Sequence, residues 1–312
     1  MKKLRNTLGT LAAIVVAFAV ADIGGAAYLL GYSLNPDPER TDTAQHLRQL
    51  YDLYPEARGW MDSLQRVGAL HDTFVTAANG ERQHAYYISN GSQRTAVVLH
   101  GWRDNALKFL YLARLYDRLL GYNVVMPELH AHGLSNGETI QMGWLDRKDV
   151  RHWMELFRTD TMVVHGVSMG AATAMMLSGD EPPAGISDLR IVEDCGYTSV
   201  DDEFRGELHN QFGLPPFPLL PTASLLCRLL NGWDFEEASA LRQVEKSQLP
   251  MLFIHGDSDT FVPTEMVYRL YAAKPGKKEL WVTRGSGHAQ SYLDHREEYV
   301  RHVADFLNRS FQ

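Results

Sequence analysis

The hydrophobic pattern of the chain alternates between two kinds of segment. Short apolar runs, typical of buried strands, are separated by stretches whose apolar residues recur at helical spacing. The runs are 95–99, 123–126, 161–164, 191–193, 251–254 and 279–282, and the helical stretches are 107–120, 144–157, 169–177, 265–273 and roughly 292–311. This alternation predicts an α/β fold with a mostly parallel central sheet and helices on both of its faces.

An antiparallel hairpin is predicted ahead of the first of these runs. Residues 74–77 and 84–89 have the pattern of two strands joined through Asn79-Gly80. An Asn-Gly pair favours a tight hairpin turn, because both residue types accept the positive φ angles that such turns require.

Between the N-terminus and the hairpin, the pattern predicts a linker followed by helices. Residues 35–43 contain two prolines and four charged residues. Helical spacing follows over 43–53 and 61–70, and Tyr54 and Trp60 are expected to pack there. We therefore predict a linker with N-terminal helices over residues 35–72 and the main domain over residues 73–312.

One segment of the main domain is too long to be a connection. Residues 197–249 contain a proline-rich centre, LPPFP at 214–218, with helical pieces on either side. An insertion of this length in a compact domain usually forms a lid or a cap. We predict a helical cap insertion over about 197–249.

The N-terminus has the features of an export or anchoring segment. Lys2, Lys3 and Arg5 form a basic tip, and residues 8–34 are mostly apolar. An uncleaved anchor of this length would cross about 30 Å of hydrocarbon. A cleaved signal peptide would instead end at the small-residue site Ala19-Val20-Ala21. We favour the anchor, because the apolar run is longer than a normal signal core.

Asp22 is the residue that opposes a membrane span, since a carboxylate at the centre of a bilayer costs on the order of 2.5–3.5 kcal/mol. Gly24 and Gly25 beside it would allow a helix partner to approach closely. We predict that residues 1–34 are a transmembrane anchor or a signal peptide. The basic tip then stays in the cytoplasm and the main domain lies outside it. The anchored form is a single-pass protein of the cell membrane, whereas the cleaved form is secreted or periplasmic.

Composition narrows the classes of partner. With 312 residues, 45% of them hydrophobic, the chain can bury a large core. The net charge of −8 and the lack of a Lys/Arg cluster beyond the N-terminal tip exclude a nucleic-acid partner. Cys195 and Cys227 are the only cysteines, and we expect two separate buried thiols because Cys195 lies in an apolar run.

Residues 162–173 combine a short apolar strand, a sharp turn and the start of a helix rich in small residues. The turn reads Gly166-Val167-Ser168-Met169-Gly170, the G-x-S-x-G pattern of a nucleophile elbow. A serine on such a strained turn leaves no room for Cβ atoms two positions away on either side. Free N–H groups at the start of the helix can meet a developing negative charge.

Other polar residues also follow predicted strands, where a parallel sheet gathers its reactive groups. In chain order they are His100-Gly101-Trp102, Glu128 to Ser135, the elbow, His255 to Pro263, and Gly285 to Ala289. A serine, an acid and a histidine thus each lie just past a strand, in that order.

These motifs resemble the α/β-hydrolase superfamily, whose nucleophile, acid and histidine follow the same order along the chain. The resemblance extends from about Phe74 to the C-terminus and is greatest to bacterial esterases and serine-aminopeptidase-like hydrolases. It implies that Ser168 attacks a carbonyl carbon while His288 transfers the proton. The backbone N–H groups of Met169 and Trp102 would form the oxyanion hole.

The resemblance places the acid of the triad at Asp259, three residues before Val262-Pro263. Asp257 is interpreted as a turn residue that bonds its own backbone. Asp194 is a third candidate, because some members of the superfamily carry the acid after the preceding strand.

Gly101, His132 and Tyr292 are the residues we expect to contact a small-molecule acyl substrate. His130 and His132 alternate on an extended segment, but no acid or further histidine follows at ligand spacing, so no metal site is expected. No cofactor is expected either.

The predicted function is that of a serine hydrolase that cleaves carboxylic esters through an acyl-enzyme. Peptidase, amidase or thioesterase activity on the same triad is the alternative. A catalytically inactive scaffold that serves as a surface binding protein is an alternative from another class.

Overall fold

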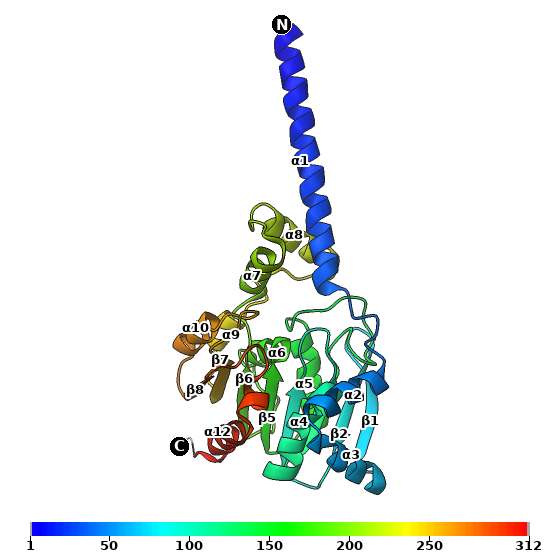
Figure 1. Ribbon diagram of the computed structural model, residues 1–312, viewed down its shortest axis with the longest axis vertical. Coiled ribbons are helices and arrows are strands. Elements are labelled where there is room, and N and C mark those ends of the chain that lie inside the picture. The colour runs from blue at the N-terminus through cyan, green and yellow to red at the C-terminus, as the bar shows by residue number, and fades with distance from the viewer. Residues whose placement is uncertain (1, 311–312) are drawn as a thin grey trace.

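The computed structural model describes residues 2–310, with side chains from residue 5 onward. A central sheet has helices on both faces, and one long helix, α1 (Lys2–Leu34), projects away from this body (Figure 1). The described N-terminal end of α1 is far from the sheet, whereas its C-terminal end meets the body beside α7 and α8.

Within the described residues, eight strands form one sheet in the order β1-β2-β4-β3-β5-β6-β7-β8. The pairs β1–β2 and β2–β4 are antiparallel and the others are parallel. The strands are β1 (Leu70–Thr76), β2 (Arg82–Ile88), β3 (Arg94–Leu99), β4 (Asn123–Pro127), β5 (Thr161–Val167), β6 (Asp188–Asp194), β7 (Met251–Gly256) and β8 (Lys278–Thr283). The predicted α/β class, hairpin and mostly parallel sheet are confirmed.

The helices follow the predicted pattern, except that the stretch 107–120 is divided into a 3₁₀ turn, a short α-helix and a π-helix, and that two other stretches differ. The helices are α2 (Thr43–Leu53), α3 (Glu56–Val67), the 3₁₀ turn η1 (Ala106–Phe109), α4 (Leu110–Arg114), the π-helical η2 (Leu115–Leu120), α5 (Asp146–Leu156), α6 (Met169–Leu177), α7 (Val200–Phe212), α8 (Leu219–Asn231), α9 (Ala240–Val244), α10 (Glu265–Ala273), α11 (Ser291–Asp294) and α12 (Arg296–Asn308).

The first difference lies in the stretch 61–70, which was predicted to be helical throughout. Gly68 ends α3 in the left-handed conformation, with φ of 62°, and its N–H bonds to carbonyls of the last turn. Leu70 therefore begins β1. The second difference is that the predicted C-terminal helix is broken at His295 and ends at Asn308, while Phe311 lies outside the described residues.

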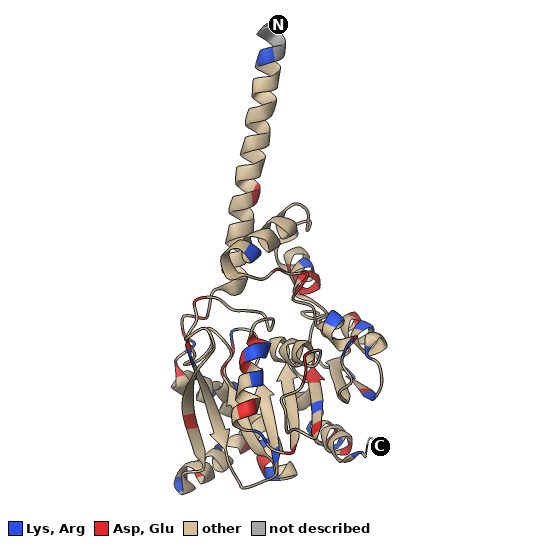
Figure 2. Cartoon of the chain, turned by 180° about the vertical axis from the view of Figure 1, so that it is seen from behind, with Lys and Arg blue, Asp and Glu red and all other residues tan. Residues whose placement is uncertain are grey.

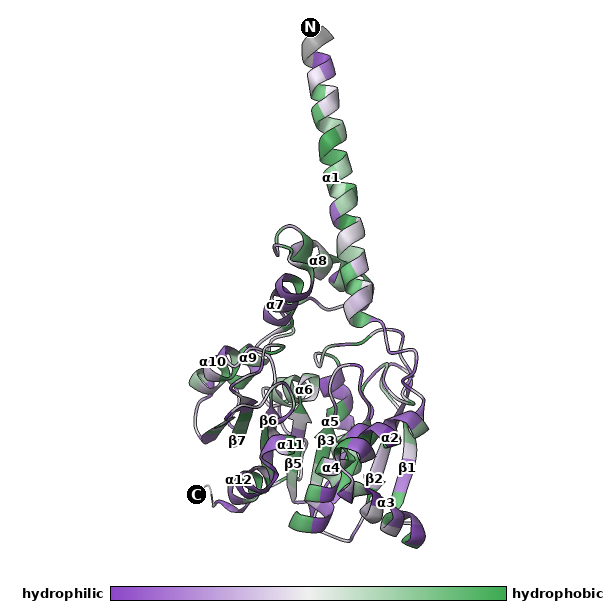
Figure 3. Cartoon of the chain, in the orientation of Figure 1, coloured by the Kyte–Doolittle hydropathy of each residue, from purple (hydrophilic) through white to green (hydrophobic). Residues whose placement is uncertain are grey.

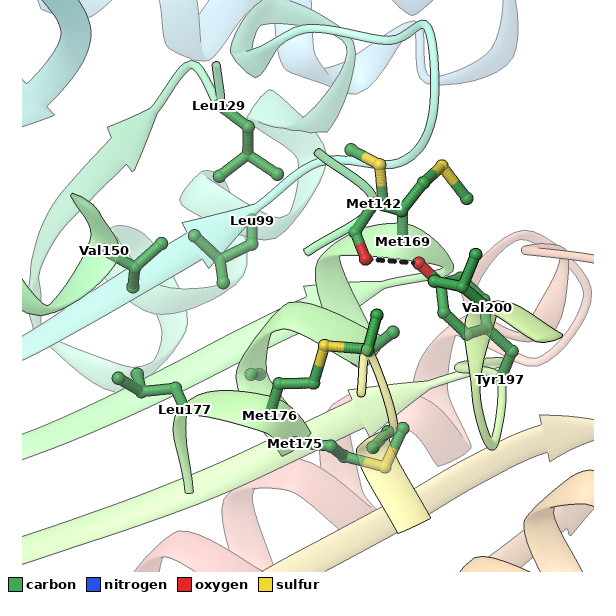
Figure 4. Packing of buried hydrophobic residues seen from close by; sticks show 14 of the residues in the cluster. Leu99, Leu129, Met142, Val150, Met169, Met175, Met176, Leu177, Tyr197 and Val200 are labelled. Atoms are coloured by element: carbon green, nitrogen blue, oxygen red, sulfur yellow. Dashed lines mark hydrogen bonds between the residues drawn. The ribbon is translucent and has the colours of Figure 1, made fainter. Parts of the chain in front are cut away.

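Alternate residues of the central strands face two separate cores. On β5, Met162 and Val164 pack with α5, α6, α9 and α10, whereas Val163 packs with the layer of α2, α3, α4 and α12. Figure 4 shows part of the first core, where Val150 of α5 lies close to Leu99 at the end of β3. Burial on both faces explains why these strands carry runs of consecutive apolar residues instead of alternating apolar and polar ones.

The segment 197–249 separates into two parts. Helices α7 and α8 form a cap between the sheet and α1 (Figure 1), whereas α9 packs against α6 and α10 in the layer that covers the sheet. The hydroxyl of Thr222 on α8 donates a hydrogen bond of 2.6 Å to the carboxylate of Asp22 on α1. A Cβ at Gly25 would lie 2.9 Å from the side chain of Leu219, so glycine allows this close approach.

Helix α1 has two differently exposed parts. Ala26, Leu30 and Leu34 are buried in the first core, whereas nearly every described side chain before Asp22 is exposed. Within the described residues, one helix is long and apolar enough to cross a membrane, and it covers Arg5–Leu34. Figure 2 shows that this helix has almost no charged positions between its N-terminal end and Asp22, and Figure 3 shows the hydrophobic colour along the same length.

Candidate active site

Ser168 lies on a sharp turn between β5 and α6, with φ of 56° and ψ of −119°. This backbone conformation is strained for a residue with a side chain. A Cβ at Gly166 would collide with the carbonyl of Gly170, and one at Gly170 would collide with the carbonyl of Leu99. The two glycines are thus required by close backbone packing, and the predicted strand–turn–helix context of Ser168 is present.

Three side chains that are far apart in the sequence form a chain of hydrogen bonds. His288 Nε2 lies 2.8 Å from Ser168 Oγ, and His288 Nδ1 lies 2.7 Å from Asp259 Oδ2. Asp259 lies in the loop that follows β7, and His288 lies in the loop that follows β8. Since β5, β6, β7 and β8 are parallel, the loops after β7 and β8 lie at the same edge of the sheet as the turn that carries Ser168. If Nδ1 donates to the carboxylate, Nε2 is free to accept the serine proton.

The environment of Asp259 keeps its carboxylate ionised. Its Oδ1 accepts hydrogen bonds from the backbone N–H groups of Phe261 and Val262, at 3.0 and 2.9 Å. Burial alone would raise the pKa of Asp259, but interactions with His255 and His288 outweigh it and hold this pKa at about 2. A permanently charged carboxylate can orient His288 and stabilise the imidazolium that forms during proton transfer.

The other two candidate acids are engaged elsewhere. Asp257 Oδ1 accepts hydrogen bonds from the Ser258 hydroxyl and from the N–H of Gly285 in the loop that follows β8, and not from the backbone of its own turn as predicted. Asp194 Oδ2 accepts a bond of 2.9 Å from the hydroxyl of Tyr299. Burial raises the pKa of Asp194 to about 6, which suits a structural carboxyl.

Two buried histidines hold the loop that follows β3. His132 Nε2 accepts a hydrogen bond from the N–H of Arg103, and His132 Nδ1 bonds to the carbonyl of His130. His100 bonds in the same manner to Gly101 O and to the N–H of Leu129. Burial lowers the pKa of both rings, so they remain neutral and each can accept one hydrogen bond while donating another.

A cavity of about 460 Å³ opens beside Ser168. Trp102 and Met169, which were predicted to supply the oxyanion donors, both line it. So do Tyr197, which donates a hydrogen bond to Met142 O (Figure 4), and Glu203 of the cap. Its lining, mostly apolar with a few polar groups beside Ser168, suits a small-molecule ligand.

Comparisons with known proteins identify the family of this chain. A family model described as the alpha/beta hydrolase family matches residues 96–302. The uncharacterized protein YqkD of Bacillus subtilis (strain 168) is 31% identical over 240 residues, which cover 75% of this chain and 78% of YqkD. The chain belongs to the alpha/beta hydrolase family. The uncharacterized protein YfhR of Escherichia coli (strain K12) is more distant, at 24% identity over 245 residues, 74% of this hydrolase and 78% of YfhR.

Solved structures are also similar to this alpha/beta hydrolase. The esterase Pf2001 of Pyrococcus furiosus superposes with a TM-score of 0.61 at 25% identity, over 77% of this chain and 92% of the esterase. The esterase EaEST of Exiguobacterium antarcticum gives a TM-score of 0.55 at 19% identity, over 76% of this chain and 99% of that one, a likeness of fold alone.

Two of the three residues expected to contact substrate lie elsewhere in this hydrolase. Gly101 is beside Ser168, since a Cβ there would lie 3.5 Å from the Cβ of Ser168. His132 is buried and holds the loop instead of lining the cavity. Tyr292 is buried against Tyr54 and Tyr111. Tyr292 is close to His288 in the sequence, but it lies on α11. Its ring packs in the second core, on the other face of the sheet from Met142 and Met169 of the cavity.

Several cavity residues were not anticipated from the sequence. Tyr32 and Ser33 belong to α1, and Glu203, Phe204 and Glu207 belong to α7. Glu203 Oε2 is buried without a hydrogen-bond partner among the described residues, and burial raises the pKa of Glu203 well above its usual range. No local pattern signals these contacts, because they depend on how the cap and α1 fold over the strand ends.

Both cysteines are free and buried, as predicted. Cys195 Sγ lies within 4.8 Å of ligand atoms of Asp259 and His288. Burial raises the pKa of Cys195 well above its usual range, so its sulfur stays a thiol. His288 Nδ1 and Asp259 Oδ2 are already hydrogen-bonded to each other. The closeness of Cys195, Asp259 and His288 is therefore explained by the hydrogen-bonded chain to Ser168.

Proposed function

We propose that this protein is a serine hydrolase that cleaves carboxylic esters through an acyl-enzyme. The observation that supports the proposal most is the uninterrupted chain of short hydrogen bonds from Ser168 through His288 to Asp259. The similarity to solved esterases supports an ester as the substrate class.

In the proposed reaction His288 takes the proton of Ser168 while Oγ attacks the ester carbonyl. The oxyanion of the tetrahedral intermediate accepts hydrogen bonds from the N–H groups of Met169 and Trp102. His288 then gives its proton to the leaving alcohol, and the acyl group remains on Ser168. A water molecule, deprotonated by His288, then attacks the carbonyl of this acyl ester and forms a second tetrahedral intermediate. When this intermediate collapses, its bond to Ser168 Oγ breaks, His288 returns the proton to Oγ, and the carboxylic acid is released.

Labelling with a fluorophosphonate probe tests the nucleophile directly. We expect the wild-type protein to label at Ser168 and Ser168→Ala to be unlabelled and inactive on p-nitrophenyl esters. Ser258→Ala is a matched control, because Ser258 also follows a strand of the sheet, but its hydroxyl bonds to the neighbouring Asp257 and not to His288. Absence of labelling in the folded wild-type protein would support the alternative of an inactive scaffold that acts as a binding protein.

Peptidase, amidase and thioesterase activities use the same three side chains and are the alternatives within hydrolase chemistry. A panel of p-nitrophenyl esters, acyl thioesters and aminoacyl p-nitroanilides separates them by kcat/KM. We expect the esters to be the best substrates.

We also propose that α1 anchors the protein in the cell membrane with the catalytic domain outside the cytoplasm. Its length, its apolar composition and the basic tip support this orientation. N-terminal sequencing of the membrane fraction tests it, because signal cleavage after Ala21 would give a new N-terminus at Asp22. Recovery of the intact chain in the cytosolic fraction would contradict both the membrane anchor and the export of a cleaved chain.

A further inference from the structure

The cap exposes a cluster of large apolar side chains. On α8, Leu225, Leu229 and Leu230 are 57%, 71% and 73% exposed, and Phe217 just before this helix is 77% exposed. Soluble monomers rarely expose such a contiguous apolar group, and it usually marks a surface for a partner or a membrane. We call these four residues the α8 face.

The α8 face lies at a defined position along the apolar helix. The bond from Thr222 to Asp22 and the close approach of Leu219 to Gly25 fix α8 beside α1. The stretch Arg5–Ala21, which precedes this contact, would span about 25 Å at 1.5 Å per residue. The hydrocarbon core of a bilayer is about 30 Å thick, so an anchored α1 must be immersed to about the level at which α8 begins. This depth places the α8 face in the lipid surface.

An apolar cleft connects this level to the nucleophile. A cavity of about 410 Å³ lies between α1, α7 and α8, and its apolar walls include Leu29, Leu30, Phe212 and Leu220. It shares Tyr32, Ser33, Phe204 and Glu207 with the cavity beside Ser168. The two cavities therefore adjoin, and together they lead from the membrane side of the cap to the reacting serine.

We infer that this hydrolase takes its substrate from the membrane: an ester with a long acyl chain that resides in the lipid surface on which the α8 face rests. The acyl chain lies in the cleft between α1 and the cap, and its carbonyl reaches Ser168. The polar side of the same cavity, with Glu203 and Glu207, receives the alcohol part of the ester. This inference rests on the proposed ester hydrolysis and on the proposed anchor.

The depth of the α8 face can be measured without any catalysis. Both native cysteines are buried, so a nitroxide spin label attaches to a newly introduced thiol. We expect the label on Leu229→Cys, in full-length protein reconstituted into phosphatidylcholine vesicles, to be accessible to dissolved oxygen and protected from a water-soluble nickel complex. Val67→Cys, at a position that is 76% exposed at the end of α3, is the control and should show the reverse. Nickel accessibility at position 229, or spin–spin broadening from a second copy of the chain, would overturn the inference.

The source of the substrate is tested with two esters in the same vesicles. We expect Leu229→Asp to reduce hydrolysis of monooleoylglycerol in the bilayer at least about tenfold, because a charge disfavours contact with lipid. Hydrolysis of water-soluble p-nitrophenyl butyrate should be unchanged, and Val67→Asp should affect neither ester. Equal rates of monooleoylglycerol hydrolysis in wild type and Leu229→Asp would overturn the inference. Failure of wild type on both esters would instead contradict the proposed function.

The cleft is tested by filling it. Leu29 lines the cleft, whereas Ala27 on the same helix is exposed and does not line it. We expect Leu29→Trp to lower the ratio of kcat/KM for p-nitrophenyl palmitate to that for p-nitrophenyl butyrate about tenfold, a difference of about 1.4 kcal/mol. Ala27→Trp should leave this ratio at the wild-type value. An unchanged ratio in Leu29→Trp would place the acyl chain outside the cleft.

Discussion

The indole nitrogen Nε1 of Trp102 donates a hydrogen bond of 2.8 Å to the carbonyl oxygen of Ser33. Ser33 belongs to the last turn of α1, where helix carbonyls have no partner within the helix. Arg103, the next residue along, donates to the carbonyls of Tyr32 and Asn35 at 2.8 and 3.1 Å. The loop that carries one proposed oxyanion donor thus also holds the C-terminal end of the apolar helix.

This link predicts that loosening the end of α1 impairs the chemistry. Arg103→Met keeps most of the side-chain bulk but removes the charge-assisted hydrogen bonds to α1. We expect kcat for a short ester to fall about tenfold, because a small displacement of the oxyanion donor weakens transition-state stabilisation. Steady-state kinetics checks this. Arg205→Met, which removes an exposed ion pair with Asp201, is the control. Wild-type kcat in Arg103→Met would show that α1 and the loop act independently.

The second prediction distinguishes the three candidate acids. Asp259→Asn removes the charge that orients His288, and we expect kcat to fall about 10³–10⁴-fold. Asp257→Asn should retain nearly full activity, since its carboxylate bonds to the Ser258 hydroxyl and to the N–H of Gly285 and not to His288. Asp194→Asn should have a small effect, because its carboxyl bonds to Tyr299. Comparison of kcat/KM for the three variants is sufficient, and an active Asp259→Asn enzyme would refute the assignment.

Much of the site could be predicted because its residues have local signals. Ser168 lies in a turn whose glycines are required by backbone contacts, and Asp259 and His288 each follow an apolar strand. Parallel strands bring their C-terminal ends to one edge of the sheet, so chain order and strand position suffice to place these three side chains together.

The remaining features could not be read from the sequence, because they are contacts between distant segments. The bond from Trp102 to Ser33 joins a side chain to a main-chain carbonyl, which any residue could supply at position 33. His132 was expected at the substrate, yet its partner is the N–H of Arg103. The glycines near Asp22 did indicate a close helix partner, but not that this partner is α8.

The third prediction concerns the pairing of Asp22 with Thr222 between α1 and α8. Thr222→Val leaves Oδ2 of the Asp22 carboxylate without its hydrogen bond. We expect a destabilisation of roughly 1–3 kcal/mol, the cost of an unsatisfied buried polar group. The double variant Asp22→Leu, Thr222→Val should recover most of this loss, since neither polar group remains.

Thermal unfolding of full-length protein in lipid vesicles measures this double-mutant cycle. Additive effects of the two substitutions would mean that the pair does not stabilise the contact between α1 and α8.

The fourth prediction is a pH dependence of stability that originates at Glu193. This residue is fully buried at the end of β6, where its Oε2 accepts a hydrogen bond of 3.0 Å from the N–H of Gly196. Burial raises the pKa of Glu193 to about 8, against the opposing effects of His255 and of that hydrogen bond. In the unfolded chain its pKa is about 4.3.

Between these two pKa values the folded state binds a proton that the unfolded state has released. The contribution of Glu193 to stability is therefore fully present below about pH 4 and declines by roughly 1.4 kcal/mol per pH unit until about pH 8. Glu193→Gln cannot ionise and keeps an oxygen that can accept from Gly196. We thus expect the variant to gain thermal stability over wild type as the pH rises from about 5 to about 8. Asp194→Asn is the control, because the pKa of Asp194 is about 6 and its gain should end near that pH. A constant difference in melting temperature between Glu193→Gln and wild type across this range would show that Glu193 is ionised in the folded protein.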